Sequence, residues 1–226
     1  MRFINGSKLR RSLASGTKEV AIVVVTALVI SSLIRILLLQ AFYIPSASME
    51  TTLMTNDKII VSKVATRLDG VRRGDVVVFV DPGGWLGDIE PTPGIKGQVQ
   101  RALTFIGFLP TNVGEHLVKR VVGVAGDNVK CCEDGKLVIN GVVITEPHTE
   151  KPTTGVDFNI TVPPGHIFVL GDNRPNSRDS RYQLENGSAG SIPVKSVVGR
   201  VFGIVWPTDR ISRVTNPALY REIDSK

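Results

Sequence analysis

The 226-residue sequence has few residues of the kinds that build metal and redox sites. Its two cysteines are adjacent, Cys131 and Cys132, and no further ligands follow at the spacing of a zinc site. A disulfide is permitted outside the cytoplasm, although one between neighbours closes a strained ring. The sequence leaves the redox state of the pair open. We favour a structural role over a redox or metal role, and we expect no metal and no cofactor.

Histidine is also scarce. His116, His148 and His166 are the three histidines, and none lies in a nucleophile-elbow or Ser-His-Asp context. No cluster has metalloprotease spacing, and no Gly-rich loop opens a helix as a phosphate site requires. We therefore interpret the histidines as structural residues and look elsewhere for a catalytic base.

Only one apolar run is long enough to span a membrane. Residues 20–39 contain a single charged residue, Arg35, and about 20 residues at 1.5 Å rise cross the hydrocarbon core. A cleaved secretory signal has a shorter apolar region, and Phe42-Tyr43-Ile44-Pro45 is a poor small-residue cleavage site. The run predicts a single transmembrane signal-anchor helix at residues 20–39.

The formal charge of +6 is concentrated in front of this run. Six of the 27 basic residues and one of the 21 acidic residues lie before Gln40, which leaves 21 and 20 after it. The positive-inside rule then makes residues 1–19 a cytoplasmic tail and places everything from Gln40 onward outside, so the chain is a single-pass cell-membrane protein. No basic patch with interleaved aromatic residues remains, which argues against nucleic-acid binding.

After Leu53 the pattern changes to short β-branched runs separated by turn residues. The expected strands are 58–61, 76–80, 117–124, 159–162, 167–170, a hairpin at 137–144 with an Asn140-Gly141 turn, and one or two strands within 192–206. They predict a mainly β, irregular barrel-like or sandwich extracytoplasmic domain at residues 40–215. Residues 85–114 are interpreted as an insertion or loop, which either contains a small helix or exposes an apolar tip to the bilayer. Residues 216–226 are interpreted as a C-terminal tail.

Ser48 lies nine residues after Leu39, in the stretch Pro45-Ser46-Ala47-Ser48. At 3.3–3.6 Å per residue its hydroxyl is at most ~30 Å from the predicted apolar core, so a nucleophile here would act on a substrate at the bilayer. Lys119 is the best candidate base, because strand alternation separates it from Val118 and Arg120 within an apolar segment. Burial would lower the pKa of its amine, whereas an edge-strand position would leave it a solvated surface lysine. These two readings stay open.

A polar stretch, Gly171 to Arg181, follows the expected strand 167–170 and combines two acids, three arginines and two serines. Four motifs in this order resemble bacterial type I signal peptidase: Ser-x-Ser-Met, Arg-Gly-Asp-Val-Val-Val-Phe, Lys-Arg-Val-Val-Gly-x-x-Gly-Asp and Gly-Asp-Asn-Arg-x-x-Ser-x-Asp-Ser-Arg. The resemblance covers most of the chain from Phe42 to about Phe202. It implies a membrane-bound serine endopeptidase that removes signal peptides from exported precursor proteins after small residues, of the Ala-x-Ala type.

The resemblance also implies individual roles. Ser48 corresponds to the nucleophile and Lys119 to the general base, while Ser177 would orient the lysine amine and Ser46 would supply an oxyanion donor beside the Ser48 amide. The remaining implied residues are the loop-bracing ion pair Asp179 and Arg181 and the substrate-pocket residues Phe42, Ile44 and Val118. Thr51 departs from the pattern, because the family has proline at this position, and this puts the rigidity of the turn in doubt.

Two other functions are compatible with parts of the sequence. One is a related Ser-Lys protease that processes itself, which the predicted membrane span and the missing DNA-binding helices argue against. The other is a non-catalytic, membrane-tethered β-domain that binds a partner, which the joint presence of Ser48, Lys119 and Ser177 argues against.

Overall fold

The structure is a computed structural model that describes residues 18–32, 38–83, 85, 116–149, 152–153, 156–185 and 187–223. The predicted cytoplasmic tail therefore enters it only at residues 18–19, and the predicted insertion at 85–114 only at Trp85. Arg35 and the apolar tip suggested within 85–114 lie outside the described residues.

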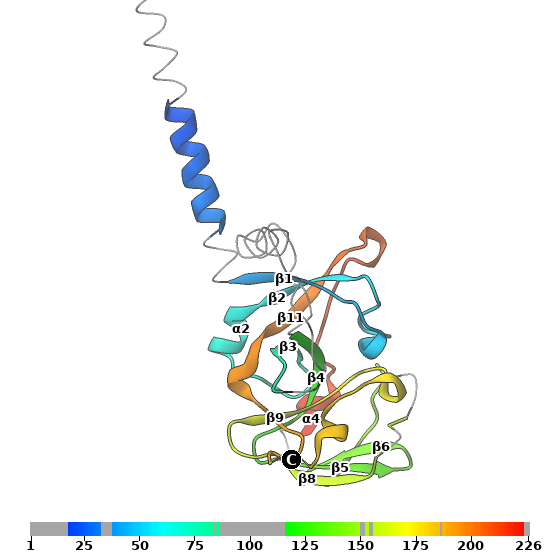
Figure 1. Ribbon diagram of the computed structural model, residues 1–226. Helices are drawn as coiled ribbons and strands as arrows, with labels where there is room; N and C mark the ends of the chain where they lie inside the picture. The colour runs from blue at the N-terminus through cyan, green and yellow to red at the C-terminus, as the bar shows by residue number, and fades with distance from the viewer. Residues whose placement is uncertain are drawn as a thin grey trace, which may run out of the picture.

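A helix covers residues 18–32 and projects from the body of the molecule (Figure 1). Its apolar side chains are exposed, for example Val20 at 65% and Leu28 at 58%. No helix in the described part of the chain is both long enough and apolar enough to cross a membrane. The span over 20–39 stays a prediction, but its end is wrong, because Leu39 is already the first residue of a strand.

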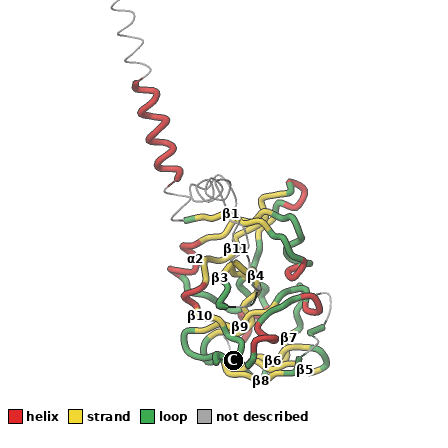
Figure 2. Tube along the Cα trace, in the orientation of Figure 1, coloured by secondary structure: helices red, strands yellow, loops and turns green. Residues whose placement is uncertain are grey.

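Two antiparallel sheets form the rest of the described chain, which confirms the mainly β fold (Figures 1 and 2). The larger sheet curls into a half-barrel with the strand order β1-β2-β11-β3-β4-β9-β10, and β12 pairs with β11. Its strands are β1 (Leu39–Tyr43), β2 (Lys58–Ser62), β3 (Val76–Val80), β4 (His116–Val124), β9 (His166–Leu170), β10 (Ile192–Pro193), β11 (Val197–Trp206) and β12 (Ser212–Arg213).

The smaller sheet has the order β7-β6-β5-β8. Its strands are β5 (Asn128–Glu133), β6 (Lys136–Ile139), β7 (Val142–Ile144) and β8 (Phe158–Thr161). The short helices of the domain are η1 (Ala47–Met49), α2 (Lys63–Leu68), η3 (Arg174–Asn176), η4 (Ser180–Gln183), η5 (Val194–Ser196), η6 (Thr208–Arg210) and α4 (Leu219–Glu222).

The continuous apolar run at 76–80 becomes a strand that is buried on both faces. Val76 and Val78 pack in one apolar cluster, and Val77 and Phe79 pack in another on the opposite face. A strand covered on both sides has no solvated face to alternate with, which is why its sequence lacks polar residues. The Asn140-Gly141 turn is also confirmed, with φ angles of 51° and 80° between β6 and β7, as the favoured two-residue hairpin turn requires.

Three strands, β1, β5 and the two-residue β12, were not predicted from the sequence. The residues of β1 were interpreted as the end of the membrane span and its exit segment. No strand was predicted after the turn at 125–128, where the structure has β5 with both cysteines. Pairing in the folded state determines β1 and β5, because β1 adds to the edge of β2 and β5 lies between β6 and β8. The C-terminal segment packs too, since Tyr220 and Ile223 are 1% and 7% exposed in the apolar cluster between the smaller sheet and β9.

Candidate active site

Ser48 is held on a tight turn, the single-turn helix η1. Ser46, the residue before η1, is extended, with φ −121° and ψ 152°. Met49, the last residue of η1, is 1% exposed, so its side chain anchors the turn in the core. The amides of Thr52 and Leu53 donate to the Met49 carbonyl oxygen at 3.1 and 2.8 Å. Ser48 itself is half-buried, so it lies near the surface, on a backbone that the buried Met49 side chain holds in place.

Lys119 meets this turn from β4. Its Nζ donates a hydrogen bond to Ser48 Oγ over 2.6 Å, and the residue is 3% exposed. β4 lies between β3 and β9 rather than at an edge, which decides between the two readings of Lys119 in favour of the buried one. Strand alternation holds as expected, because Val118 and Val121 pack in different apolar clusters.

Burial lowers the pKa of Lys119 from 10.5 to about 8, because desolvation penalises the ammonium form. The carboxylates of Asp179 and Asp172 oppose this shift, and the Arg181 guanidinium adds to it. At pH 7.4 a pKa of about 8 leaves about one amine in five neutral, against about one in a thousand for an ordinary lysine. The 2.6 Å contact therefore joins a hydroxyl to an amine that can accept its proton.

The two serines that the resemblance assigns to this site differ in placement. Ser46 Oγ lies 3.4 Å from Ser48 Oγ and is exposed, within reach of an atom bound to Ser48. Ser177 is 7% exposed, and its hydroxyl has no hydrogen-bond partner in the described part of the chain. The expected bond from Ser177 to Lys119 is therefore absent from the structure, since the described bond of the lysine amine goes to Ser48. Ser177 packs beside Gly171, where an added Cβ would collide with the Ser177 hydroxyl and the Ser48 carbonyl oxygen.

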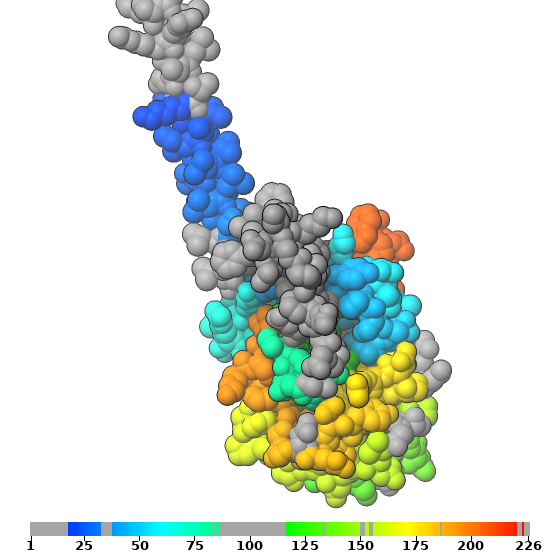
Figure 3. Space-filling view, viewed as in Figure 1, coloured from blue at the N-terminus to red at the C-terminus, as the bar shows by residue number. Residues whose placement is uncertain are grey.

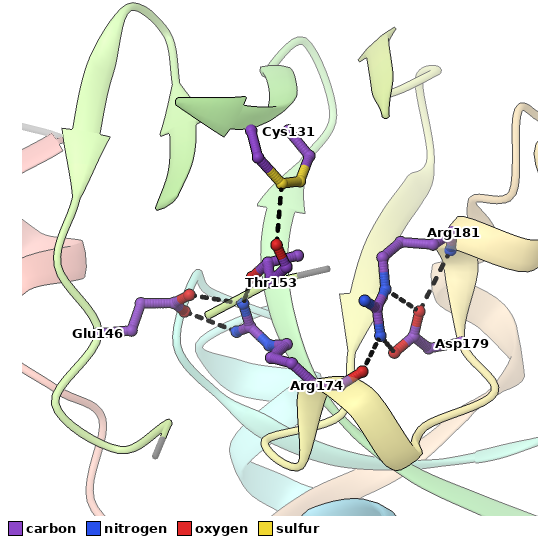
Figure 4. The surroundings of a disulfide bond; sticks show 7 residues. Cys131, Glu146, Thr153, Arg174, Asp179 and Arg181 are labelled. Carbon is purple, nitrogen blue, oxygen red and sulfur yellow. Dashed lines mark hydrogen bonds and ion pairs between the residues drawn. A yellow bond between two sulfur atoms is a disulfide. The ribbon is translucent and has the colours of Figure 1, made fainter. Parts of the chain in front are cut away.

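Asp179 and Arg181 form a fully buried ion pair with two parallel bonds, Nε to Oδ1 at 2.8 Å and Nη2 to Oδ2 at 2.9 Å (Figure 4). Asp179 also accepts from the Gly171 amide at 3.1 Å, and Arg181 Nη2 donates to the Arg174 carbonyl oxygen at 2.7 Å. The pair thus connects both ends of the loop from Gly171 to Arg181.

A second buried ion pair lies on β4 beside the lysine, and the sequence analysis did not find it. Arg120 donates from Nε and Nη2 to the two oxygens of Asp172 at 2.8 and 2.7 Å, and from Nη1 to the Gly74 carbonyl oxygen at 2.8 Å. Thr52, in the turn after Ser48, donates its hydroxyl to Asp172 Oδ2 at 2.5 Å. The available signal was that Arg120 and Asp172 are charged residues within motifs that had already been recognised.

A third ion pair was also missed. Glu146 accepts two hydrogen bonds from Arg174, at 2.6 and 2.8 Å (Figure 4). It also accepts one from the Tyr220 hydroxyl of α4. Burial by itself raises the pKa of Glu146, but the Arg174 charge outweighs it and holds the pKa well below its usual range. Arg174 donates further to the Gly171 carbonyl oxygen at 2.9 Å. The smaller sheet and the C-terminal helix therefore both support the loop behind Ser48.

His148 lies beside two of the buried ion pairs. Its Nε2 lies 3.4 Å from Glu146 Oε1 and 3.7 Å from Asp172 Oδ1. Its backbone carbonyl accepts a hydrogen bond from the hydroxyl of Thr51 at 2.5 Å. Thr51 has a φ of +85°, a conformation that proline, with φ near −65°, cannot adopt. The departure from the family pattern at this residue is therefore matched by a different backbone conformation and by a tertiary hydrogen bond.

Phe42, Ile44 and Val118 pack in a single apolar cluster with exposures of 0%, 2% and 7%. The structure brings the three predicted pocket residues together, on the segment that enters the Ser48 turn and on the strand that carries Lys119. They belong to the apolar core, and Val118 is the most accessible of them.

The cysteines lie apart from Ser48, on β5. Cys131 and Cys132 are joined in a disulfide, and Cys132 Sγ lies 3.2 Å from the Thr153 carbonyl oxygen (Figure 4). Among the described residues, the one group with metal-binding side chains in proximity consists of this pair and Asp157, and its thiols are taken up by the disulfide.

Comparisons with known proteins identify the family to which the chain belongs. Residues 17–206 match the family described as signal peptidase, peptidase S26. A signal peptidase I of Mycobacterium tuberculosis is 35% identical over 90% of this chain and 78% of its own, and a probable signal peptidase I-2 of Synechocystis is 32% identical over 88% and 78%. A solved signal peptidase I of Enterococcus faecalis is 26% identical over 57% of this chain and 95% of its own, with a TM-score of 0.37. The chain therefore belongs to the signal peptidase S26 family, and it is an enzyme, a peptide-bond hydrolase.

Proposed function

We propose that this chain cleaves signal peptides from exported precursor proteins by means of a Ser48 nucleophile and a Lys119 general base. The observation that carries the proposal is the 2.6 Å contact between Lys119 Nζ and Ser48 Oγ, made by an amine whose pKa burial lowers to about 8. A serine hydroxyl is a weak nucleophile unless a neighbouring base removes its proton, and the neutral amine is such a base.

The neutral amine of Lys119 takes the proton of Ser48 Oγ, and a bond forms between Oγ and the carbonyl carbon of the substrate. The oxygen of the tetrahedral intermediate carries the negative charge, which the Ser46 hydroxyl and the Ser48 amide stabilise. When the C–N bond breaks, the Lys119 ammonium gives its proton to the departing amine, which is the new N-terminus of the mature protein. A water molecule, activated by the neutral amine, then attacks the acyl-enzyme, and Ser48 leaves with its proton restored.

Ser177 acts in this mechanism as a positioning residue for the lysine amine. Its buried hydroxyl, which is unpaired among the described residues, supports this role, because a movement of the amine toward it would satisfy that hydroxyl. Asp179 and Arg181 hold the loop on which Ser177 lies. Small side chains before the cut occupy pockets at Phe42, Ile44 and Val118, which a small opening of the apolar cluster would expose.

The enzyme is anchored in the cell membrane by the apolar segment from Val20 to Leu38, which ends before β1, with residues 1–19 in the cytoplasm and the catalytic domain outside. The apolar side chains of the helix at 18–32 support this arrangement, because they are exposed among the described residues and are suited to a lipid surface. The apolar segment of a precursor's signal peptide lies in the same bilayer, so the anchor brings enzyme and substrate together.

Cleavage of a peptide with an Ala-x-Ala sequence by the detergent-solubilised full chain tests the proposal. We expect Ser48→Ala and Lys119→Arg each to reduce kcat/KM at least ~10⁴-fold, because the first lacks the nucleophile and the second cannot become neutral. Thermal unfolding of both variants controls for loss of fold. If the Ser48→Ala variant cleaves the peptide at the wild-type rate, Ser48 is excluded as the nucleophile. If the Lys119→Arg variant does so, the lysine is excluded as the base.

A further inference from the structure

A cavity of about 390 Å³ opens beside the Ser48 turn. Its walls come from two segments: Glu50, Thr51 and Met54 follow the nucleophile, and Asn173 and Pro175 belong to the loop after β9. These segments lie side by side on the surface (Figure 3). The cavity is thus built from the same pieces as the proposed catalytic centre, and nothing in the mechanism above uses it.

Asn173 fixes this wall directly to the turn. Its backbone N–H donates a hydrogen bond to the Ser48 carbonyl oxygen at 3.2 Å, and its side-chain Nδ2 donates one to the Ala47 carbonyl oxygen at 3.0 Å. The same Nδ2 donates to Glu50 Oε2 at 3.2 Å, which orients the carboxylate at the cavity. The distance between the cavity wall and Ser48 is therefore set by hydrogen bonds rather than by loose packing.

The charges that line the cavity leave one carboxylate without a cation. Asp172 is paired with Arg120, and Arg174 is paired with Glu146. Glu50 makes no ion pair with any described residue. The two buried pairs cancel at short range, so Glu50 determines the sign of the potential in the cavity, and that sign is negative.

The cavity and the three predicted pocket residues are built from different segments next to Ser48. Phe42 and Ile44 precede the nucleophile in the chain and pack with Val118, whereas the cavity is lined by the segment that follows the nucleophile and by the loop after β9. With the residues before the cut placed over Phe42, Ile44 and Val118, as proposed above, the cavity is open to the residues after the cut. An extended residue covers at most 3.3–3.6 Å, so the first two residues after the cut lie within about 7 Å of the reacting carbonyl.

We infer that this cavity is the subsite for the first two residues of the mature protein, and that Glu50 makes it select basic side chains over acidic ones. The inference rests on the proposed function. A carboxylate held at a partly solvated rim attracts a lysine or arginine and repels an aspartate or glutamate, an effect that salt screens. Glu50 is accordingly a specificity-determining residue rather than a catalytic one.

The test uses peptides that are identical through the Ala-x-Ala segment and carry Lys, Gln or Glu at the first or at the second position after the cut. For the full-length enzyme in detergent at low ionic strength, we expect kcat/KM for the Lys peptide to exceed that for the Glu peptide roughly three- to tenfold, the range of one partly exposed charge pair. In Glu50→Gln the ratio should fall to about one. In about 1 M salt the wild-type ratio should shrink in the same direction.

Glu185→Gln is the matched control, because it removes the same charge from an exposed position outside the cavity. It should keep the wild-type ratio. A Glu50→Gln enzyme that retains the wild-type preference, or a wild-type enzyme without any Lys-over-Glu preference, overturns the subsite. Either result leaves the proposed function standing, since that depends on Ser48→Ala and Lys119→Arg and not on this ratio.

Discussion

Lys119 and Arg120 are consecutive residues of β4, and both are buried, with 3% and 1% of their surface exposed. Arg120 is surrounded by acceptors: both oxygens of Asp172 and the Gly74 carbonyl oxygen. Lys119 makes its hydrogen bond to a neutral hydroxyl, and no described carboxylate is in ion-pair contact with it. Adjacent residues of one strand thus send two cations to opposite faces and into opposite environments.

The difference separates a structural charge, Arg120, from the amine proposed as the catalytic base, Lys119. A buried cation costs free energy unless it is paired, and Arg120 meets that requirement with a two-point contact that keeps it charged at all relevant pH values. Lys119 lacks such a partner, and for a base this lack is useful because it favours the neutral form. The paired side holds the turn and the loop in place, and the unpaired side carries the amine that we propose as the proton acceptor.

The largest expected effect comes from breaking the paired side. Asp172→Asn leaves the Arg120 guanidinium buried without its carboxylate, and we expect the free energy of unfolding to fall by about 3–5 kcal/mol. Urea unfolding of the full chain measures it, with the exposed Asp209→Asn as control, for which a change within about 0.5 kcal/mol is expected. Equal stability of the two variants would show that the Arg120 contact is not the support that the structure indicates.

The pH dependence of cleavage tests the role of the unpaired Lys119 amine. Only the neutral amine can accept the proton of Ser48, so kcat/KM should rise with pH through an apparent pKa near 8 and level off above it. The neutral fraction grows from about 1% at pH 6 to about 90% at pH 9, which predicts an increase of roughly 90-fold for wild type. The initial rate of peptide cleavage against pH measures this. A flat profile over this range would remove Lys119 from the role of base.

The smallest effect concerns the link between the two sides. The Thr52 hydroxyl donates to Asp172 and accepts from Arg120 Nη2 at 3.2 Å, so it connects the paired charges to the turn that carries Ser48. Thr52→Val keeps the shape but loses both bonds, and we expect about 1 kcal/mol less stability and a severalfold lower kcat. Thr52→Ser should restore kcat. If valine and serine variants behave alike, the hydroxyl contributes nothing to the position of the turn.

Much of the fold was predictable because most of its strands have a local sequence signal. The run at 76–80 and the Asn140-Gly141 hairpin depend on β-branched side chains and on turn residues that tolerate positive φ, which are properties of the residues themselves. β1 was not predictable, because its sequence continues the apolar run before it and only pairing with β2 makes it a strand. The burial of Tyr220 is equally tertiary, since a short segment after residue 215 has no local signal for docking.

The sequence by itself determined the family and the candidate residues for the chemistry. Ser48, Lys119, Ser177 and the Asp179–Arg181 pair stand out by residue type and order, and the order of motifs is typical of one family. The tertiary structure alone decided how they are arranged. It placed β4 inside the sheet, so that burial lowers the pKa of Lys119, and it paired Arg120 with Asp172 and Arg174 with Glu146 across more than 20 residues of chain. The physical reason is that a residue's chemical identity is local, whereas its solvation and its charged neighbours exist only once distant segments pack together.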